Sequence, residues 1–289
     1  NVAPIAYETN RTISEAEYDK LDFPYNQLAF TRYVVTKDGT ATAAEVKQEL
    51  EAEVKEFDFQ LPEKNNGTAL IVPMENGYQV KMKETQELEV SVPEPEEKDG
   101  VLFVQFRIEN KKPKKDIEIS LEGERNKLSS TKHVYYNGNT LFTYAIGLEK
   151  GQKTVCLSLG KGEYTITDMR AYTSELNVDD GLYQSVFQVD KKQTKGNLIQ
   201  GKISTQKDGM FITSIPFDKG FEVTVDGTKV KCEKVNKAFL GFPLDAGKHE
   251  IRILYHAPGV VAGKVLTGFG ILVVAAGMIR KRRMRKKNV

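Results

Sequence analysis

The chain has 289 residues, of which 39% are hydrophobic and 28% are charged, a balance typical of globular domains. Its formal net charge is +2, but the last ten residues carry +7, so residues 1–279 sum to −5. This distribution gives no support for a nucleic-acid-binding surface outside the tail. The three histidines and the two cysteines, Cys156 and Cys232, lack metal-ligand spacing. We therefore predict no metal site and no cofactor, and we interpret both cysteines as small buried hydrophobic residues.

Residues 1–62 are predicted to form a helical and irregular N-terminal segment. Ser14 to Glu17, with the sequence SEAE, matches a helix capping box. Residues 24–35 (PYNQLAFTRYVV) place a proline near a first helical turn and repeat apolar residues at helical spacing. Residues 42–57 (TAAEVKQELEAEVKEF) are rich in strong helix formers. Both stretches are predicted to be helices.

Residues 63–176 are predicted to form an extracytoplasmic β-sandwich. From about Thr68, apolar and polar residues alternate in short runs, such as YQVKMK, LEVSV, VLFVQFRI and TVCLSL. Turn-forming pairs such as Asn76–Gly77 and Lys161–Gly162 separate these runs. Several short strands with regular turns favour an antiparallel sandwich.

Residues 177–197 are predicted to be a helical connector, because Leu182, Val186 and Val189 recur at helical spacing. Residues 198–258 are predicted to form a second β unit. In it, Asp226 and Gly227 separate two alternating runs, which predicts a type I′ hairpin turn with positive φ at both residues. The runs AFLGFPL and HEIRILYH are predicted to form a further hairpin, joined by DAGK.

Residues 259–280 are predicted to be a transmembrane helix. Between Val260 and Ile279 the only charged residue is Lys264, and 20 helical residues span about 30 Å, the thickness of a bilayer core. A buried core helix is the alternative, but such a helix is not apolar throughout and then strongly cationic. The predicted fold class is therefore mainly β, with two antiparallel sandwich or jelly-roll-like units, a helical N-terminal segment and one C-terminal transmembrane helix.

A basic tail, residues 281–289, follows the predicted helix. Basic residues that flank a membrane span stay on the cytoplasmic side, so residues 1–257 are expected to be extracytoplasmic and the tail cytoplasmic. The expected partner of this segment is the lipid bilayer of the cell membrane, and no nucleic acid is expected. The membrane-flanking basic residues are Arg280, Lys281, Arg282, Arg283, Arg285, Lys286 and Lys287.

No catalytic residue is predicted in this chain. The sequence contains no Gly-X-Ser-X-Gly, P-loop or zinc-binding motif. The candidate contact residues are aromatic: His133, Tyr135 and Tyr136 lie in HVYYNGN beside a turn. Exposed tyrosines on a sandwich loop can stack on sugar rings and hydrogen-bond through their hydroxyls. Ordinary packing at the edge of a sheet is the alternative.

Three segments in the last third of the chain carry a resemblance to a known family. They are IPFDKGFEVTVDG (215–227), NKAFLGFPLDAGKHEI (236–251) and YHAPG (255–259) before the final helix. This pattern resembles the C-terminal region of YfhO-type bacterial membrane proteins, and it is specific from about Gly201 to Gly270. The family often has Trp where Phe221 stands, and Pro where His256 or Ala257 stands.

The resemblance implies a GT-C-type glycosyltransferase that moves a sugar from a polyprenyl-phosphate carrier to an envelope polymer, such as lipoteichoic acid in Gram-positive bacteria. It also implies that this chain is the C-terminal third of such a protein. The catalytic carboxylate then lies on an early loop of the N-terminal membrane part, outside this chain. The implied partners are that membrane part and an envelope polysaccharide or teichoic acid.

Two function hypotheses follow from these features. In the first, the chain is an accessory extracytoplasmic domain and anchor of a polytopic membrane glycosyltransferase. In the alternative, it is a single-pass cell-surface module that binds carbohydrate or adheres, without catalysis. The number of apolar spans encoded before Asn1 distinguishes the two hypotheses.

Overall fold

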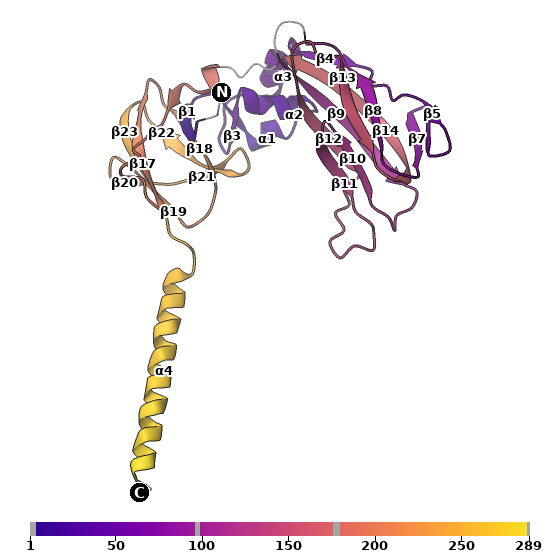
Figure 1. Ribbon diagram of the computed structural model, residues 1–289. Coiled ribbons are helices and arrows are strands. Elements are labelled where there is room, and N and C mark those ends of the chain that lie inside the picture. Colours follow the sequence, from indigo (N-terminus) through magenta and orange to yellow (C-terminus); the bar gives the residue numbers. More distant parts are fainter. Residues whose placement is uncertain (1–3, 96–98, 176–179, 288–289) are drawn as a thin grey trace. The chain divides into compact units, whose positions relative to one another are not determined.

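The structure is a computed structural model that describes residues 4–95, 99–175 and 180–287 (Figure 1). Its strands form mostly antiparallel sheets and its last element is a long helix, which confirms the predicted mainly β class. The described residues divide into two compact units. The terminal unit comprises residues 4–20, 29–43 and 180–287, and the inserted unit comprises residues 21–28, 44–95 and 99–175.

The inserted unit is a β-sandwich preceded by two short helices. Its elements are α2 (Tyr25–Leu28), α3 (Ala43–Glu51), β4 (Val54–Phe57), β5 (Lys64–Asn65), β6 (Ala69–Met74), β7 (Gly77–Met82), β8 (Gln86–Ser91), β9 (Gly100–Asn110), β10 (Ile117–Leu121), β11 (Glu124–Leu128), β12 (Leu141–Leu148), β13 (Thr154–Leu159) and β14 (Gly162–Glu175). One sheet has the order β12-β9-β14-β7-β6-β5, with β4 paired to β14, and the other has the order β11-β10-β13-β8.

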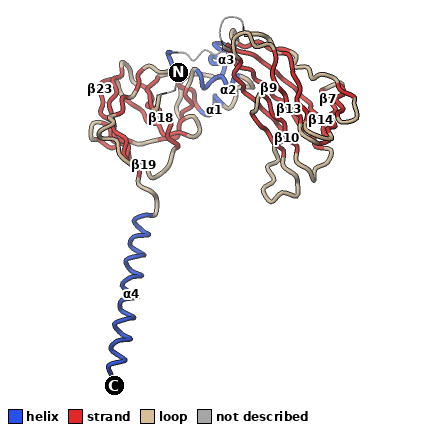
Figure 2. The backbone as a smooth tube through the Cα atoms, viewed as in Figure 1, coloured by secondary structure: helices blue, strands red, loops and turns tan. Residues whose placement is uncertain are grey.

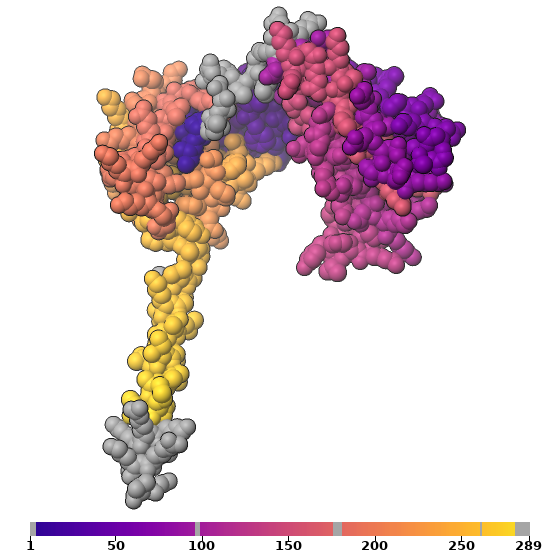
Figure 3. Space-filling view, in the orientation of Figure 1, coloured from indigo at the N-terminus to yellow at the C-terminus, as the bar shows by residue number. Residues whose placement is uncertain are grey.

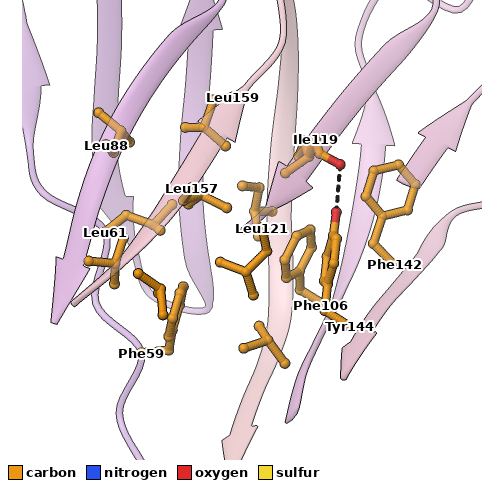
Figure 4. Close-up of a cluster of buried hydrophobic side chains, with 14 of the residues drawn as sticks. Phe59, Leu61, Leu88, Phe106, Ile119, Leu121, Phe142, Tyr144, Leu157 and Leu159 are labelled. Carbon is orange, nitrogen blue, oxygen red and sulfur yellow. Dashed lines mark hydrogen bonds between the residues drawn. The ribbon is translucent and has the colours of Figure 1, made fainter. Parts of the chain in front are cut away.

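Alternating apolar residues of the two sheets fill one core (Figure 4). The ring of Phe106 lies 6.0 Å from that of Phe142 and 5.8 Å from that of Tyr144, between centroids. The hydroxyl of Tyr144 on β12 donates to the carbonyl of Ile119 on β10 at 2.8 Å. This bond joins the two sheets. Burial raises the pKa of Tyr144, so the phenol keeps the proton that it donates.

The terminal unit contains two five-stranded sheets and the final helix (Figure 2). Its elements are β1 (Ala6–Thr9), β2 (Thr12–Ser14), α1 (Glu15–Tyr18), η1 (Ala29–Thr31), β3 (Val34–Thr36), η2 (Asp180–Leu182), β15 (Ser185–Val186), β16 (Gln188–Val189), β17 (Leu198–Thr205), β18 (Gly209–Pro216), β19 (Phe221–Val225), β20 (Thr228–Val230), β21 (Glu233–Val235), β22 (Phe239–Leu244), β23 (Gly247–Tyr255) and α4 (Val260–Lys287). The sheet orders are β15-β1-β18-β22-β21 and β16-β17-β23-β19-β20, and β2 pairs with β3 in parallel.

The two ends of the sequence meet in this unit. β1 pairs with β18, with Ala6 opposite Thr213, and it pairs on its other side with β15. A second contact ties β3 to the turn after β21. The Asn236 side chain accepts the backbone N–H of Val35 at 2.8 Å, and the Asn236 N–H donates to the Val35 carbonyl, also at 2.8 Å. Residues 4–20 and 29–43 are therefore part of a fold whose other strands come from the C-terminal part of the chain.

The N-terminal segment contains less helix than predicted. The capping box is confirmed, because the Ser14 hydroxyl accepts the backbone N–H of Glu17 at 3.2 Å at the start of α1. The predicted helix at 24–35 is reduced to α2 and η1 before β3, and the helix at 42–57 ends at Glu51. Residues 54–57 pair with β14 instead. Pairing with a sheet edge outweighs the helix propensity of these residues.

The helix predicted for the connector at 177–197 is wrong for the described residues. Residues 180–182 form one 3-10 turn, and two short strands follow. Between those strands, Phe187 is buried, with its ring centroid 5.4 Å from that of Phe211. β15 belongs to one sheet and β16 to the other. The apolar spacing reflects a chain that crosses between sheets and buries its side chains on the way.

The hairpin predicted from AFLGFPL and HEIRILYH is also wrong. β22 pairs with β18 and β21, whereas β23 pairs with β17 and β19 in the other sheet. Both strands bury residues in the same core, including Phe242 and Ile251. The turn DAGK therefore carries the chain from one sheet to the other. Alternation in the sequence shows two buried faces, but it does not show which strands are hydrogen-bonded neighbours.

β1 also carries a buried carboxyl group. Glu8 is 1% exposed, and its Oε1 has no hydrogen-bond partner among the described residues. A Cβ atom added at Gly209 would lie 2.0 Å from this oxygen, so the glycine leaves the space that the carboxyl occupies. Burial raises the pKa of Glu8, and a side-chain hydrogen bond with Ser185 opposes the rise.

We expect Glu8→Gln to stabilise the terminal unit at pH 7. Because the folded-state pKa of Glu8 is raised, ionisation favours the unfolded chain, and stability falls as pH rises through the unfolded-state pKa of about 4.3. Gln has the shape of the protonated carboxyl and does not ionise. Thermal unfolding of the variant and the wild type should differ near neutrality and coincide below about pH 4.

The exposed Glu15→Gln in the same unit is the control, and it should not raise stability at pH 7. A Glu8→Gln variant that is less stable than the wild type at pH 7 would show that the ionised carboxyl is tolerated.

Candidate functional site

The three predicted sugar-contact residues lie on residues 129–140 between β11 and β12, which we call the tyrosine loop (Figure 1). Tyr135 is 82% exposed and Tyr136 is 49% exposed, and Val134 before them is 88% exposed. The Nδ1 atom of His133 accepts the backbone N–H of Tyr135 at 3.1 Å. The structure thus brings these side chains together on one loop. Their contact with sugar stays a prediction.

An asparagine fixes the base of the tyrosine loop. The Asn137 Oδ1 atom accepts the backbone N–H and the hydroxyl of Ser129, both at 3.1 Å. Its Nδ2 donates to the carbonyl of Lys127 at 2.7 Å, and its own N–H donates to the Ser129 hydroxyl at 2.9 Å. These bonds hold the loop ends together, so the exposed side chains stand on an ordered support.

A second loop packs against the tyrosine loop. Residues 111–115 (KKPKK), which we call the lysine turn, connect β9 to β10. The backbone N–H and the hydroxyl of Thr131 donate to the Pro113 carbonyl at 2.8 and 3.0 Å. The backbone N–H of Ser130 donates to Asp116 at 2.6 Å. The lysine run is visible in the sequence, but its contact with the tyrosine loop is not, because that contact depends on how the sheets place the two connections.

The turn at Asp226 and Gly227 lies in the terminal unit. The two residues have φ values of 51° and 80°, and they connect the paired residues Val225 and Thr228. The Asp226 carboxylate accepts the backbone N–H of Glu250 at 2.8 Å and lies 2.7 Å from His249 Nδ1. These two contacts, the backbone bond first, lower the pKa of Asp226.

A hollow of about 390 Å³ adjoins this turn, and Lys202, Lys248 and His249 are among its lining residues. The other ring nitrogen of His249, Nε2, lies 3.0 Å from the carbonyl of Asp245. Both nitrogens of the imidazole therefore have partners within the fold. Within the part of the chain that the structure describes, no cluster of three or more His, Cys, Asp or Glu could hold a metal.

The interpretation of both cysteines as buried is wrong for one of them. Cys156 on β13 is exposed, whereas Cys232 is half-buried against the core of the terminal unit. Alternation along β13 puts Val155 and Leu157 into the sandwich core and turns Cys156 outward. The thiol pKa of Cys156 is raised by partial burial and by the nearby carboxylates of Glu87, Glu122 and Glu89.

α4 contains a stretch with the length and composition of a membrane span. Residues Ala262–Arg280 have a mean hydropathy of 1.8, and none of their side chains is buried against other residues. Lys264 lies near the first end of this stretch, and Arg280 closes it. The helix backbone continues to Lys287. The other predicted flanking basic side chains, from Lys281 to Lys287, lie outside the residues whose side chains are described.

Comparison with known proteins identifies the family. The model of the family described as "Bacterial membrane protein YfhO" matches residues 1–267, which include both units and the first part of α4. The chain belongs to the YfhO family. Membership in this family and the apolar stretch of α4 both indicate a membrane-associated protein.

A curated YfhO relative matches along most of the chain. It is the "Uncharacterized protein YfhO" of Bacillus subtilis (strain 168), 22% identical over 285 residues. The match covers 96% of this chain but only 31% of that relative, so the chain spans about a third of the relative's length.

Similarity of this YfhO chain to solved structures is weak. PNGF-II is 8% identical, with a TM-score of 0.25, over 76% of this chain and 64% of that one. A cupin 2 conserved barrel domain protein from Leptotrichia buccalis is 11% identical, with a TM-score of 0.18, over 68% of this chain and 92% of that one. Scores this low carry no argument about function.

We expect Asp226→Asn to remove a stabilising interaction that depends on pH. Because the folded-state pKa of Asp226 is lowered, its stabilising effect is present above the unfolded-state pKa of about 3.9 and is lost as pH falls through the lower folded-state pKa. Asn can still accept the Glu250 N–H but carries no charge beside His249. Denaturant unfolding should show the wild type more stable near neutrality, with the difference shrinking below about pH 4.

Asp245→Asn is the matched control, because that side chain is exposed and only its backbone carbonyl meets His249. An Asp226→Asn difference that persists undiminished at the acid end would show that the charge of Asp226 contributes nothing.

Proposed function

We propose that this chain is the extracytoplasmic accessory region and membrane anchor of a polytopic membrane glycosyltransferase. The parent protein transfers a sugar from a polyprenyl-phosphate carrier to a cell-envelope polymer, such as lipoteichoic acid of a Gram-positive bacterium. The observation that carries the proposal is membership in the YfhO family along residues 1–267. The family resemblance supplies the reaction class.

The length of the chain relative to its curated relative supports an accessory role. The chain spans 31% of its curated relative, so such a protein has room for a membrane bundle outside this region. In the proposal the catalytic carboxylate belongs to that bundle. The two β units then act by placing surfaces near the membrane.

The proposed orientation places residues 1–257 outside the cell and the basic tail in the cytoplasm. Seven basic residues follow the apolar stretch within eight positions, and such residues remain on the cytoplasmic side. The bilayer and the N-terminal membrane part of the same protein are the proposed partners.

Sugar transfer should require the parent protein. We expect purified residues 1–289 in lipid nanodiscs to transfer no sugar from a polyprenyl-phosphate donor, because the catalytic carboxylate lies outside them. Membranes that contain the full reading frame should transfer the labelled sugar to envelope polymer. The measurement is radiolabel in the polymer fraction.

Transfer by residues 1–289 alone would contradict the accessory role. If the full reading frame is inactive while residues 1–289 bind purified envelope polymer, the single-pass binding module is the better description.

The exposed thiol of Cys156 reports the orientation. We expect a membrane-impermeant maleimide to label Cys156 in intact cells, and Cys156→Ser to reduce the label on this protein to the slow reaction of Cys232. The rate should increase about tenfold per pH unit below the thiol pKa, following the thiolate fraction, and because that pKa is raised the increase should continue to higher pH than for an ordinary thiol. Cys232 should react slowly, because burial raises its pKa to about 11.

A cysteine at position 288, made by Asn288→Cys in the Cys156→Ser background, should react only after the cells are permeabilised. The reverse labelling pattern would contradict the proposed orientation.

A further inference from the structure

The tyrosine loop presents exposed apolar and aromatic surface, and the ring of Tyr135 has its described aromatic contact with His133 of the same loop, 6.3 Å between centroids. Val134 is 88% exposed, Tyr135 82% and Tyr136 49%, and Leu141, the first residue of β12, is 39% exposed. Single exposed apolar residues are normal on a protein surface, whereas contiguous exposed apolar residues are a feature of interaction sites. The loops at this end of the sandwich project beyond its body (Figure 3).

The same end of the sandwich carries unbalanced positive charge. Three of its lysines are paired: Lys111 with Glu109 at 2.7 Å, Lys112 with Glu163 at 2.7 Å, and Lys127 with Asp116 at 2.6 Å. Three more lysines are exposed and have no ion-pair partner among the described residues. They are Lys114, Lys115 and Lys132.

The lysine turn is held in one geometry. The backbone N–H of Lys112 donates to Asn110 Oδ1 at 2.8 Å, and Asn110 Nδ2 donates to the Lys115 carbonyl at 2.8 Å. The Thr131 contacts with Pro113 then join the turn to the tyrosine loop. The backbones of the two loops are therefore held together, so the lysines and the aromatic side chains project from one joined support.

We propose that the tyrosine loop and the lysine turn together dock on the anionic headgroups of a lipid bilayer, with Val134 and Tyr135 entering the interface. Tyrosine is enriched at the membrane–water boundary because its ring is apolar and its hydroxyl is polar. Lysines beside it are attracted to anionic lipid. A projecting tip fits a surface, whereas small ligands such as sugars are held in concave sites.

The chain itself suggests the bilayer as the occupant. α4 contains a stretch of 19 residues long and apolar enough to cross a membrane, so the chain carries its own candidate anchor in a lipid surface. A tethered domain needs only weak additional contacts, because the tether raises the effective concentration of the second site. The proposed contact would hold the inserted unit at the membrane, and it does not depend on the glycosyltransferase proposal.

The chain contains no tryptophan, so a single Tyr135→Trp substitution gives a unique fluorescent probe. The full chain, reconstituted in nanodiscs of brominated phosphatidylglycerol, should lose about half or more of its emission relative to nanodiscs of unbrominated lipid, as expected for an indole in the interface. The matched control is Lys150→Trp, on the exposed loop after the opposite end of β12. Its emission should be the same in both lipids.

The charge dependence forms a second arm. In the Tyr135→Trp background, Lys114→Glu with Lys115→Glu should reduce the brominated-lipid quenching severalfold, and so should brominated phosphatidylcholine in place of phosphatidylglycerol. The same lysine changes should leave thermal unfolding unaltered, since both side chains are exposed and unpaired among the described residues.

Equal quenching at positions 135 and 150, or none at 135, would overturn the proposal. A shift in the emission of the Tyr135→Trp variant on adding soluble poly(glycerol phosphate), without quenching by brominated lipid, would also overturn it. That outcome would assign this surface to an anionic envelope polymer instead.

Discussion

The pairing of β1 between β15 and β18 is the interaction on which the terminal unit depends. Four residues from the start of the chain complete a sheet whose other strands come from residues 185–244. β15 joins that sheet only through β1 in the described topology. From β15 the chain crosses to the second sheet at Phe187, and full burial of such a side chain stabilises a fold by about 1.5–3 kcal/mol. Loss of β1 would thus expose both a sheet edge and the crossing point.

This pairing explains how the sequence of a second β unit can be inserted into the sequence of the first. The terminal unit and the inserted unit have separate cores, one containing Phe211 and Phe242 and the other containing Phe106 and Phe142. Because β1 precedes the insertion and β15 follows it, pairing of the two fixes the ends of the inserted segment. An insertion with its own core can carry new loops at little cost to the surrounding fold, and the tyrosine loop and the lysine turn are such loops.

Local sequence patterns correctly predict features that depend on neighbouring residues. They fail where pairing with a distant strand determines the structure. The capping box at Ser14 and the apolar stretch of α4 depend on neighbouring residues, and both are present. The helix expected at 42–57 ends early, because residues 54–57 pair with β14, a strand more than a hundred residues away. The tyrosine loop could be read from HVYYNGN, but its lysine neighbours could not, because two sheet connections bring them together.

The two units differ in how they are connected to the final helix. β23 ends at Tyr255 and α4 begins at Val260, so any force on the membrane helix reaches the terminal unit first. In that unit long-range pairing holds the strand before the helix: β23 lies between β17 and β19, and the Asn236 bonds tie β3 to the same fold. Along the chain, the inserted unit is joined to α4 only by way of the terminal unit. The proposed placement of the inserted unit at a membrane therefore rests on its own surface, where exposed tyrosines lie beside exposed lysines, the surface chemistry that a lipid headgroup layer attracts.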